Sequence, residues 1–569
     1  MKKGKYVLII FLIFFFLIVL TFVSFFYYEL GRPPSVKARS YFELNLSGEI
    51  VERAAPHLFS SLMGMEPLSM HDLWMNIQKA KKDQRIKCVL LRLGNLQCNW
   101  AKINEIREAI LDFRSSGKKA YAYIQEAPEF DKEYYLATAC DEIILHPLGL
   151  LGVNGIGGYT PFFKKALNNL GIQAEFVHVE EYKTASNMFT EEGFTPAHKQ
   201  MMESLYDDLF THYVKTLADS RGKSEDEIKR MIDTGFYHGK KAVEAGLVDK
   251  LLFQDELKNL LKEDGKKLSS ITHHRYSKIK PSSLGLNKGK KMALIYGMGL
   301  IHTGESTVQT MGSETVAGWI RKARNDQSIK GIIFRVDSPG GSAMASDIIW
   351  REVVLTKEKK PVVVSMSDVA GSGGYWISMA AHKIVAQPQT LTGSIGVLSG
   401  KFNMEEFYEK MGITSEKLTY GKRADIFSTF RGLTSEEREV LKNQILWIYD
   451  QFLTKAAEGR NMEKEEIHKV GKGRVWTGHQ AEELGLVDEM GGISKAINLA
   501  KDLAGIPEDE QVKLVVWPKK VSFLSALWGR KKAQICLPLK ANAKKIANSL
   551  AGLEGSKIWA IMPLWMAAD

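Results

Sequence analysis

The sequence predicts an α/β protein that contains two copies of one fold, and three observations support this prediction. Short apolar runs alternate with amphipathic stretches along most of the chain, as they do where helices join buried strands. Residues 83–93 match residues 326–336 at an offset of 243, and further matches follow in the same order at offsets of 241 and 239. The apolar content of 45% and the charged content of 25% are those of a globular chain and exclude a disordered or collagen-like protein.

The N-terminal residues 1–30 predict a membrane anchor. Residues 6–28 carry no charge, and as a helix they would extend about 34 Å, enough to cross a bilayer core. Lys2, Lys3 and Lys5 place the N-terminus in the cytoplasm and the body of the chain outside it. The run is longer than a cleavable signal and lacks a small-residue cleavage site, although a cleaved signal is the alternative. Residues 31–40 are expected to be a short linker.

The body of the chain divides into two repeats on the basis of the internal matches. The first repeat is expected at 41–262 and the second at 292–510, with a lysine-rich linker at 263–291 between them. We expect buried strands at 89–93, 119–124, 332–336 and 361–366, and helices at 75–82, 319–325, 346–356, 375–381 and 436–454.

Residues 511–569 form a basic tail that accounts for most of the excess of positive charge, which is +11 for the whole chain. Its tryptophans and lysines indicate either a segment that lies on anionic lipid or a final strand at 512–517 with helices that pack on the body. Nucleic acid is not expected as a partner outside the cytoplasm. The four cysteines have no paired spacing, which excludes a disulfide framework and a cysteine-based zinc site.

The two repeats differ at the places where chemistry is expected. In the second repeat a strand leads into Ser-Pro-Gly-Gly-Ser at 338–342, and Ala-Gly-Ser-Gly-Gly follows at 370–374. Paired glycines after a strand allow backbone N–H groups to approach a ligand closely. The first repeat has lost these glycines and carries Asp131 in the place of Ser372, but it has Lys183 where the second repeat has Ala424. The pattern predicts one composite site, with its serine and lysine in different repeats.

These motifs, together with Leu-Thr-Gly-Ser-Ile-Gly-Val at 391–397, resemble the signal peptide peptidase A family, also called protease IV, in its long, duplicated, membrane-anchored form. The resemblance implies tandem Clp/crotonase-like (ββα spiral) domains and a homotetrameric serine peptidase with a Ser-Lys dyad that needs no metal or cofactor. The family usually has alanine at the position of Gly371, so the local turn here is expected to be looser. The site residues implied are the nucleophile Ser372, the general base Lys183, the oxyanion-hole residues Gly340 and Gly373, and the base-orienting Ser394.

The resemblance further implies a single-pass protein of the bacterial inner membrane with its catalytic body in the periplasm, where it degrades hydrophobic peptides such as cleaved signal peptides. Two other functions remain open from the residues alone. The protein could be a crotonase-type acyl-CoA enzyme, since that fold also uses glycine-rich oxyanion holes, although an anchored body outside the cytoplasm argues against it. It could also be a catalytically silent scaffold that binds peptides or organises envelope proteins. Taken singly, Ser372 could be a turn serine that caps a helix and Lys183 a surface charge. Asp337 is expected to be a turn residue rather than the acid of a triad.

Overall fold

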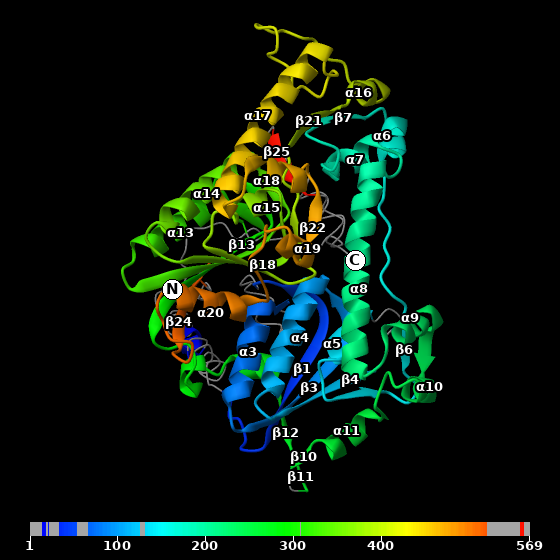
Figure 1. Ribbon diagram of the computed structural model, residues 1–569, viewed down its shortest axis with the longest axis vertical. Helices are drawn as coiled ribbons and strands as arrows, with labels where there is room; N and C mark the ends of the chain where they lie inside the picture. Colours follow the sequence, from blue (N-terminus) through cyan, green and yellow to red (C-terminus); the bar gives the residue numbers. More distant parts are fainter. Residues whose placement is uncertain are drawn as a thin grey trace, which may run out of the picture.

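A computed structural model describes residues 14–18, 21, 34–53, 67–125, 131–263, 265–307, 309–519 and 558–562. Two large, mainly parallel sheets, each covered by helices, lie one above the other in Figure 1. The mixed α/β architecture that the alternating pattern predicted is therefore confirmed. The predicted anchor falls almost wholly outside the described residues, and none of the helices within them is both long and apolar enough to cross a bilayer.

The first sheet is built from residues 40–272 in the strand order β12-β1-β3-β4-β5-β9. Its strands are β12 (Ser269–Thr272), β1 (Ser40–Val51), β3 (Ile86–Gln97), β4 (Lys119–Ile124), β5 (Glu142–Leu145) and β9 (Lys250–Leu251), with the short β2 (Leu68–Ser69) beside β1. All of these neighbours pair in parallel. Helices α3 (Met70–Lys82), α4 (Trp100–Arg114) and α5 (Asp131–Ala137) contribute apolar side chains to the same core.

The second sheet is built from residues 290–517 in the order β22-β20-β18-β16-β13-β24. The main strands are β13 (Lys290–Met298), β16 (Ile329–Ser338), β18 (Val362–Gly371), β20 (Leu391–Gly393), β22 (Val475–Thr477) and β24 (Val512–Trp517). Strand β18 is buried at every position, as expected for a strand that is covered on both faces. Helices α13 (Ser313–Asn325), α14 (Ala343–Lys357), α17 (Ser435–Arg460) and α20 (Ile493–Leu503) flank it.

A third sheet combines strands from both repeats and from the tail, in the order β15-β14-β17-β25-β21-β7. Its strands are β15 (Thr310–Gly312), β14 (Leu300–His302), β17 (Gly340–Ser342), β25 (Ile558–Ile561), β21 (Leu398–Asn403) and β7 (Gln173–His178). Strand β7 belongs to the first repeat in sequence, yet it pairs antiparallel with β21 of the second. The long helix α8 (Pro196–Arg221) then returns the chain to the first repeat, as Figure 1 shows.

Most of the predicted elements lie where the periodicity placed them, usually with a few more residues at each end. Two differ. Part of the predicted linker at 263–291 forms β12 and α12 (His273–Ser277), which join the first sheet because Ile271 and Tyr276 are buried in its core. The helix expected at 375–381 is the short α15 (Gly373–Trp376), which starts directly after Ser372. The tail segment at 512–517 is strand β24, paired with β13, which was one of its two predicted alternatives.

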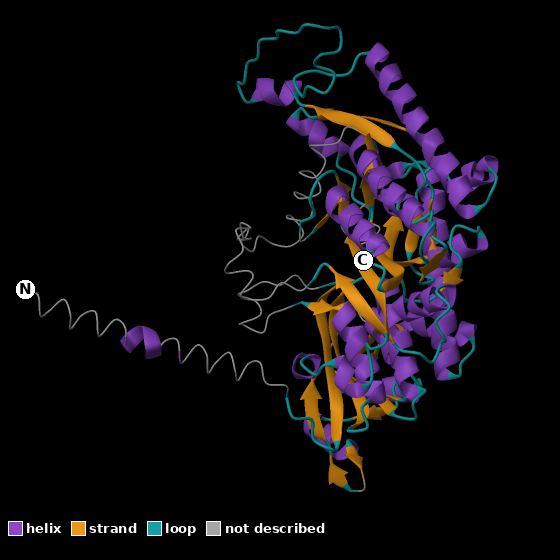
Figure 2. Ribbon diagram, turned by 90° about the vertical axis from the view of Figure 1, so that its left-hand side faces the viewer, coloured by secondary structure: helices purple, strands orange, loops and turns teal. Residues whose placement is uncertain are grey.

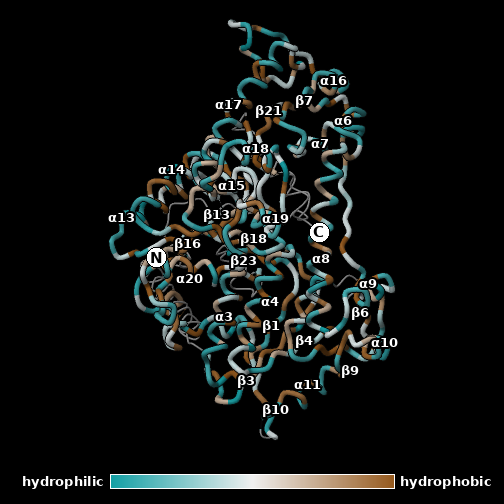
Figure 3. Tube along the Cα trace, in the orientation of Figure 1, coloured by the Kyte–Doolittle hydropathy of each residue, from teal (hydrophilic) through white to brown (hydrophobic). Residues whose placement is uncertain are grey.

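The hydropathy of the chain follows this layering. In Figure 3 the strands β13 and β16 are largely hydrophobic, whereas the segment between α16 (Glu405–Lys410) and α17 is mainly hydrophilic. In the side view of Figure 2, the strands of the lower part lie toward the left and most of the helices lie to their right.

Candidate active site

Ser372 sits at a tight junction between strand β18 and helix α15. Its backbone has φ 54° and ψ −112°, a region that a residue with a side chain rarely adopts. The neighbouring chain holds this conformation, since the N–H of Ser372 donates to Gly393 O at 2.8 Å and its carbonyl accepts from Trp376 N at 2.8 Å. Such strain is stored at functional sites when the surrounding structure determines the position fully. The serine is completely buried in this structure.

Lys183 reaches Ser372 because strand β7 pairs with β21. The pairing continues one residue beyond the strands, where Val179 N donates to Val397 O, and Tyr182 N then donates to Lys472 O in the segment before β22. A β-carbon on Gly473 would lie 2.5 Å from Lys183 N, so this close passage of two backbones requires glycine. The lysine side chain is completely buried. The sequence difference between the repeats thus corresponds to a meeting of the two residues in space.

The amine of Lys183 has three neighbours. Its Nζ lies 2.8 Å from Ser372 Oγ, 2.9 Å from Ser394 Oγ and 3.0 Å from Ser394 O. A neutral amine has two N–H donors and one lone pair. The carbonyl and hydroxyl oxygens of Ser394 can accept the two N–H groups, which leaves the lone pair for the O–H of Ser372. The geometry therefore satisfies a neutral lysine fully.

Burial lowers the pKa of Lys183 well below the usual value of lysine, because the charged form loses its hydration there. Lys102 provides a contrast, since it is a second buried lysine. Burial would lower its pKa too, but the carboxylates of Asp337, Asp368 and Glu52 outweigh that effect and raise it well above the usual value. Burial thus favours the uncharged form of Lys183, whereas the surrounding carboxylates favour the charged form of Lys102.

The hydroxyl of Ser372 has a second acceptor within reach. Gly396 O lies 3.3 Å from Ser372 Oγ. A protonated Lys183 has three N–H donors for its three neighbours and no lone pair, so the serine O–H must then turn to Gly396 O. Loss of one proton from Lys183 frees the lone pair and lets the serine O–H turn to the amine.

Gly340 and Gly373 lie side by side next to the serine. A β-carbon on Gly340 would lie 2.7 Å from Gly373 N, and the backbone of Gly340 has φ 99°, which favours glycine. Gly373 is the first residue of α15 and directly follows Ser372. The N–H of Gly340 donates to Ser338 Oγ at 3.2 Å. Both backbone amides are therefore near the nucleophile, and one already has a long hydrogen bond.

Asp337, expected as a turn residue, instead belongs to a buried ion cluster between the repeats. Lys102 Nζ lies 2.7 Å from Asp337 Oδ2 and 3.0 Å from Asp368 Oδ2. Arg335 Nε lies 2.9 Å from Glu52 Oε2, and the same guanidinium contacts Glu105. The cluster joins the first repeat to β16 and β18, the strands that lead to Gly340 and Ser372. No sequence signal identified it, because each member taken singly resembles an ordinary surface charge.

The first repeat has no nucleophile at the matching position. Asp131 accepts hydrogen bonds from Tyr213 Oη at 2.6 Å and from the backbone N–H of Gly155 at 3.0 Å. Nearby, Glu133 accepts the N–H of Leu96 at 2.6 Å, and burial raises the pKa of this carboxyl to about 7. Carboxylates thus fill the positions around which the second repeat arranges its serine and glycines.

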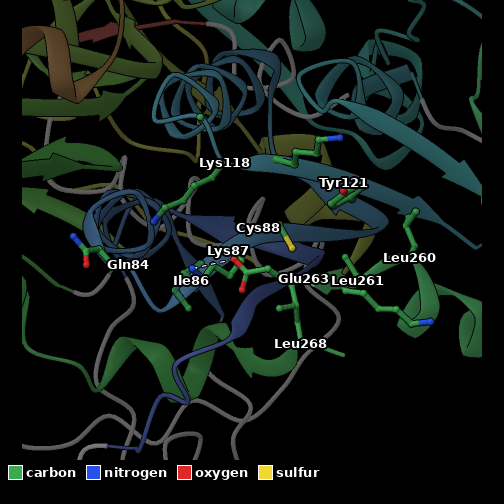
Figure 4. Close-up of a pocket in the computed structure, with 13 residues that line it drawn as sticks. Gln84, Ile86, Lys87, Cys88, Lys118, Tyr121, Leu260, Leu261, Glu263 and Leu268 are labelled. Atoms are coloured by element: carbon green, nitrogen blue, oxygen red, sulfur yellow. Dashed lines mark ion pairs between the residues drawn. The ribbon is translucent and has the colours of Figure 1, made fainter. Parts of the chain in front are cut away.

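A pocket of about 550 Å³ lies on the first repeat, and neither Ser372 nor Lys183 lines it. Figure 4 shows Lys118, Cys88 and Tyr121 around it, together with the ion pair between Lys87 and Glu263. Burial raises the pKa of Cys88 to about 12, so its thiol is protonated and unreactive at neutral pH. Within the described part of the chain no group of three or more His, Cys, Asp or Glu side chains is placed to hold a metal ion.

A serine hydroxyl against a buried lysine amine, beside glycine amides at a strained strand–helix turn, is an arrangement that serine hydrolases use. Comparison with known proteins agrees with that class. The model of peptidase family S49 matches residues 112–269 and 355–507, one segment in each repeat. The chain belongs to peptidase family S49 and is a serine peptidase.

Two relatives match over most of their length. The chloroplastic serine protease SPPA of Arabidopsis thaliana is 36% identical over 491 residues, which cover 84% of this chain and 71% of that protein. Protease 4 of Salmonella typhi is 32% identical over 504 residues, which cover 84% of this chain and 80% of that protein. Among solved structures, ClpP1 from Listeria monocytogenes matches 35% of this chain and 89% of its own, at 16% identity and a TM-score of 0.23.

Proposed function

We propose that the protein is a membrane-bound endopeptidase of Clp/crotonase-like fold that uses a Ser372–Lys183 dyad to degrade hydrophobic peptides such as cleaved signal peptides. The observation that carries the proposal is the 2.8 Å contact between Ser372 Oγ and a buried Lys183 Nζ, beside which the described residues place no carboxylate to hold it charged. Family membership supports peptide hydrolysis over acyl-CoA chemistry.

The proposed reaction begins when Ser372 Oγ bonds to the peptide carbonyl carbon and its proton passes to Lys183 Nζ. The backbone N–H groups of Gly340 and Gly373 receive the oxyanion, which competes with the 3.2 Å bond from Gly340 to Ser338. The ammonium of Lys183 then protonates the departing amine as the C–N bond breaks, leaving an ester on Ser372. Water then attacks the ester carbonyl and gives a proton to Nζ. The bond from the carbonyl carbon to Ser372 Oγ breaks, Nζ returns the proton to Oγ, and the peptide leaves as its carboxylic acid. Ser394 keeps the lone pair of the amine directed at Ser372.

The substrate class is supported by the apolar surroundings of the site. Met201, Leu205, Val369, Leu391 and Val475 belong to one buried cluster beside the end of β18. The proposal includes a single-pass anchor in the bacterial inner membrane, with the N-terminus in the cytoplasm and the body in the periplasm. It also includes a homotetramer that acts without a cofactor or nucleic acid. An anchored body would meet peptides that remain in the bilayer after preprotein processing.

The test is the hydrolysis of a hydrophobic signal-like peptide by the detergent-solubilised full chain. Lys183→Ala and Ser372→Ala are expected to lower kcat/KM at least about 1000-fold, as loss of a catalytic group does. Lys79→Ala is the matched control, since it removes another buried lysine, whose Nζ donates to the carbonyls of Tyr276 and Ile279. Normal cleavage by folded Lys183→Ala would refute the dyad. Absence of cleavage by every form of the protein would favour the scaffold function.

A further inference from the structure

The tail strand β25 lies in the middle of the third sheet. Its residues pair antiparallel with β17, with Ile561 opposite Gly340 and Ala560 opposite Gly341, and on its other side Trp559 pairs with Leu398 of β21. Strands β17 and β21 share no direct pairing, so β25 fills a slot one strand wide between them. In Figure 1 it is the red strand between β21 and α15. Addition of an extended peptide to exposed strand edges is a recurrent mode of peptide binding.

The side chains of β25 and the following Met562 alternate between two surroundings. Trp559 and Ile561 pack with Leu300 and Leu398 on one face. Met562 points the other way, into the apolar cluster that contains Val369 and Leu391. Trp559, Ala560, Ile561 and Met562 are at most 7% exposed. The segment therefore fits the slot with both of its faces, as a bound peptide would.

Contacts of this segment reach the nucleophile and the glycine amides. A β-carbon on Gly371 would lie 2.6 Å from Met562 Sδ, so the absence of a side chain next to Ser372 makes room for this methionine. The N–H of Met562 donates to Pro339 O at 2.7 Å. A β-carbon on Gly340 would lie 2.1 Å from Ala560 O, and one on Gly373 would lie 3.1 Å from it. The tail thus runs directly past the residues that the proposed mechanism uses.

We propose that residues 558–562 are an intramolecular ligand of the peptidase site, which occupies the slot that an extended apolar peptide must enter. The segment Ile-Trp-Ala-Ile-Met is uncharged and apolar, like the proposed substrates. The strand itself ends at Ile561, and the sequence continues after Met562 with a proline, a residue that has no N–H for a ladder bond. The tail competes with substrate, and peptide binds only when β25 leaves. The identity of the competing ligand rests on the proposed function.

The test measures peptide binding without catalysis, in the Ser372→Ala background of the full chain in detergent. The probe is a fluorescein-labelled peptide Ser-Lys-Ile-Trp-Ala-Ile-Met, followed by fluorescence anisotropy. Met562→Asp places a charge in the apolar pocket and is expected to lower the apparent Kd of the probe at least tenfold. That value corresponds to a slot that is open in less than about a tenth of wild-type molecules. Met411→Asp is the matched control, because Met411 is 63% exposed; it is expected to leave the Kd unchanged.

An unchanged Kd for folded Met562→Asp would overturn the proposal. If that variant does not fold, Trp559→Ala serves instead, since it weakens the strand from its other face. Hydrogen exchange provides a second readout: the amides of β17 and β21 should lose protection in the variant and regain it with the probe. The two proposals fail separately. Tighter binding without hydrolysis by Met562→Asp with Ser372 intact would refute the peptidase mechanism alone. Dyad-dependent hydrolysis with no effect of Met562→Asp on the Kd would refute the intramolecular ligand alone.

Discussion

Removal of one hydroxyl, in Ser394→Ala, tests how the lysine is oriented. The Oγ of Ser394 is 2.9 Å from Lys183 Nζ and accepts one of the two N–H groups of the neutral amine. Because Nζ is fully buried, that N–H loses its partner when the hydroxyl is removed, and an unsatisfied buried donor costs about 1–3 kcal/mol. If this free energy is lost from the orientation in which the amine accepts the serine proton, kcat/KM decreases roughly 5- to 150-fold.

The pH dependence of kcat/KM in the same variant provides a second, independent test, because the direction in which its acid limb moves can be predicted. The hydroxyl of Ser394 stabilises an ammonium more strongly than an amine, since hydrogen bonds from charged donors are the stronger ones. Its loss lowers the pKa of Lys183 further, below a value that burial already depresses. The acid limb of kcat/KM against pH should therefore move to lower pH in Ser394→Ala.

The assay is steady-state hydrolysis of a fluorogenic hydrophobic peptide across pH, with the folded state of each variant checked by circular dichroism. Ser313→Ala is the matched control, since it removes a fully buried hydroxyl that has no hydrogen-bond partner among the described residues. We expect the control to keep the wild-type profile. A plateau rate within twofold of wild type for Ser394→Ala, or an acid limb displaced to higher pH, would refute the assigned role of Ser394.

Three further predictions follow from the buried charges and glycines. Unfolding lets Lys183 take up a proton below its usual pKa of 10.5, so Lys183→Met should raise the Tm at pH 7 by at least about 2 °C, and the gain should shrink as the pH approaches 10.5 in thermal melts. Lys102→Met leaves the carboxylates of Asp337 and the buried Asp368 without their cationic partner, and urea titration should show a loss of about 3–5 kcal/mol. Gly340→Ala places a β-carbon 2.7 Å from Gly373 N at a φ of 99°, which disturbs both proposed oxyanion amides, and kcat/KM should decrease at least about 100-fold.

Sequence reasoning succeeded where the information is local or repeated. The strands β16 and β18, which lead to Gly340 and Ser372, were visible as apolar runs followed by glycine turns. The difference between the repeats and the family resemblance together singled out Lys183, whose amine lies 2.8 Å from Ser372 Oγ. The α/β class and the duplication follow from the same patterns. The periodicity of hydrophobic residues identifies a strand or a helix, but it does not identify the strand with which a given strand pairs.

The parts that could not be predicted depend on distant pairing. Nothing in residues 173–178 indicates that β7 leaves its own repeat to pair with β21. The pentapeptide at 558–562 reads only as a short apolar stretch in a basic tail, and its place beside Gly340 depends on a slot formed by other strands. The ion cluster around Lys102 and Arg335 was missed for a related reason, because charges are expected at the surface until a partner is seen.

The buried charges and the site together make the chemistry depend on the contact between the repeats. Arg335 of the second repeat is 1% exposed and is neutralised by Glu52 and Glu105 of the first, so separation of the repeats would leave charges without partners. The contact that pairs these charges also brings β7 to β21 and places Lys183 against Ser372. Carboxylates surround Lys102 and Arg335 at the interface. For Lys183, burial is the cause that lowers the pKa. The same contact between the repeats therefore pairs the buried charges and brings Lys183, the proposed base, against Ser372.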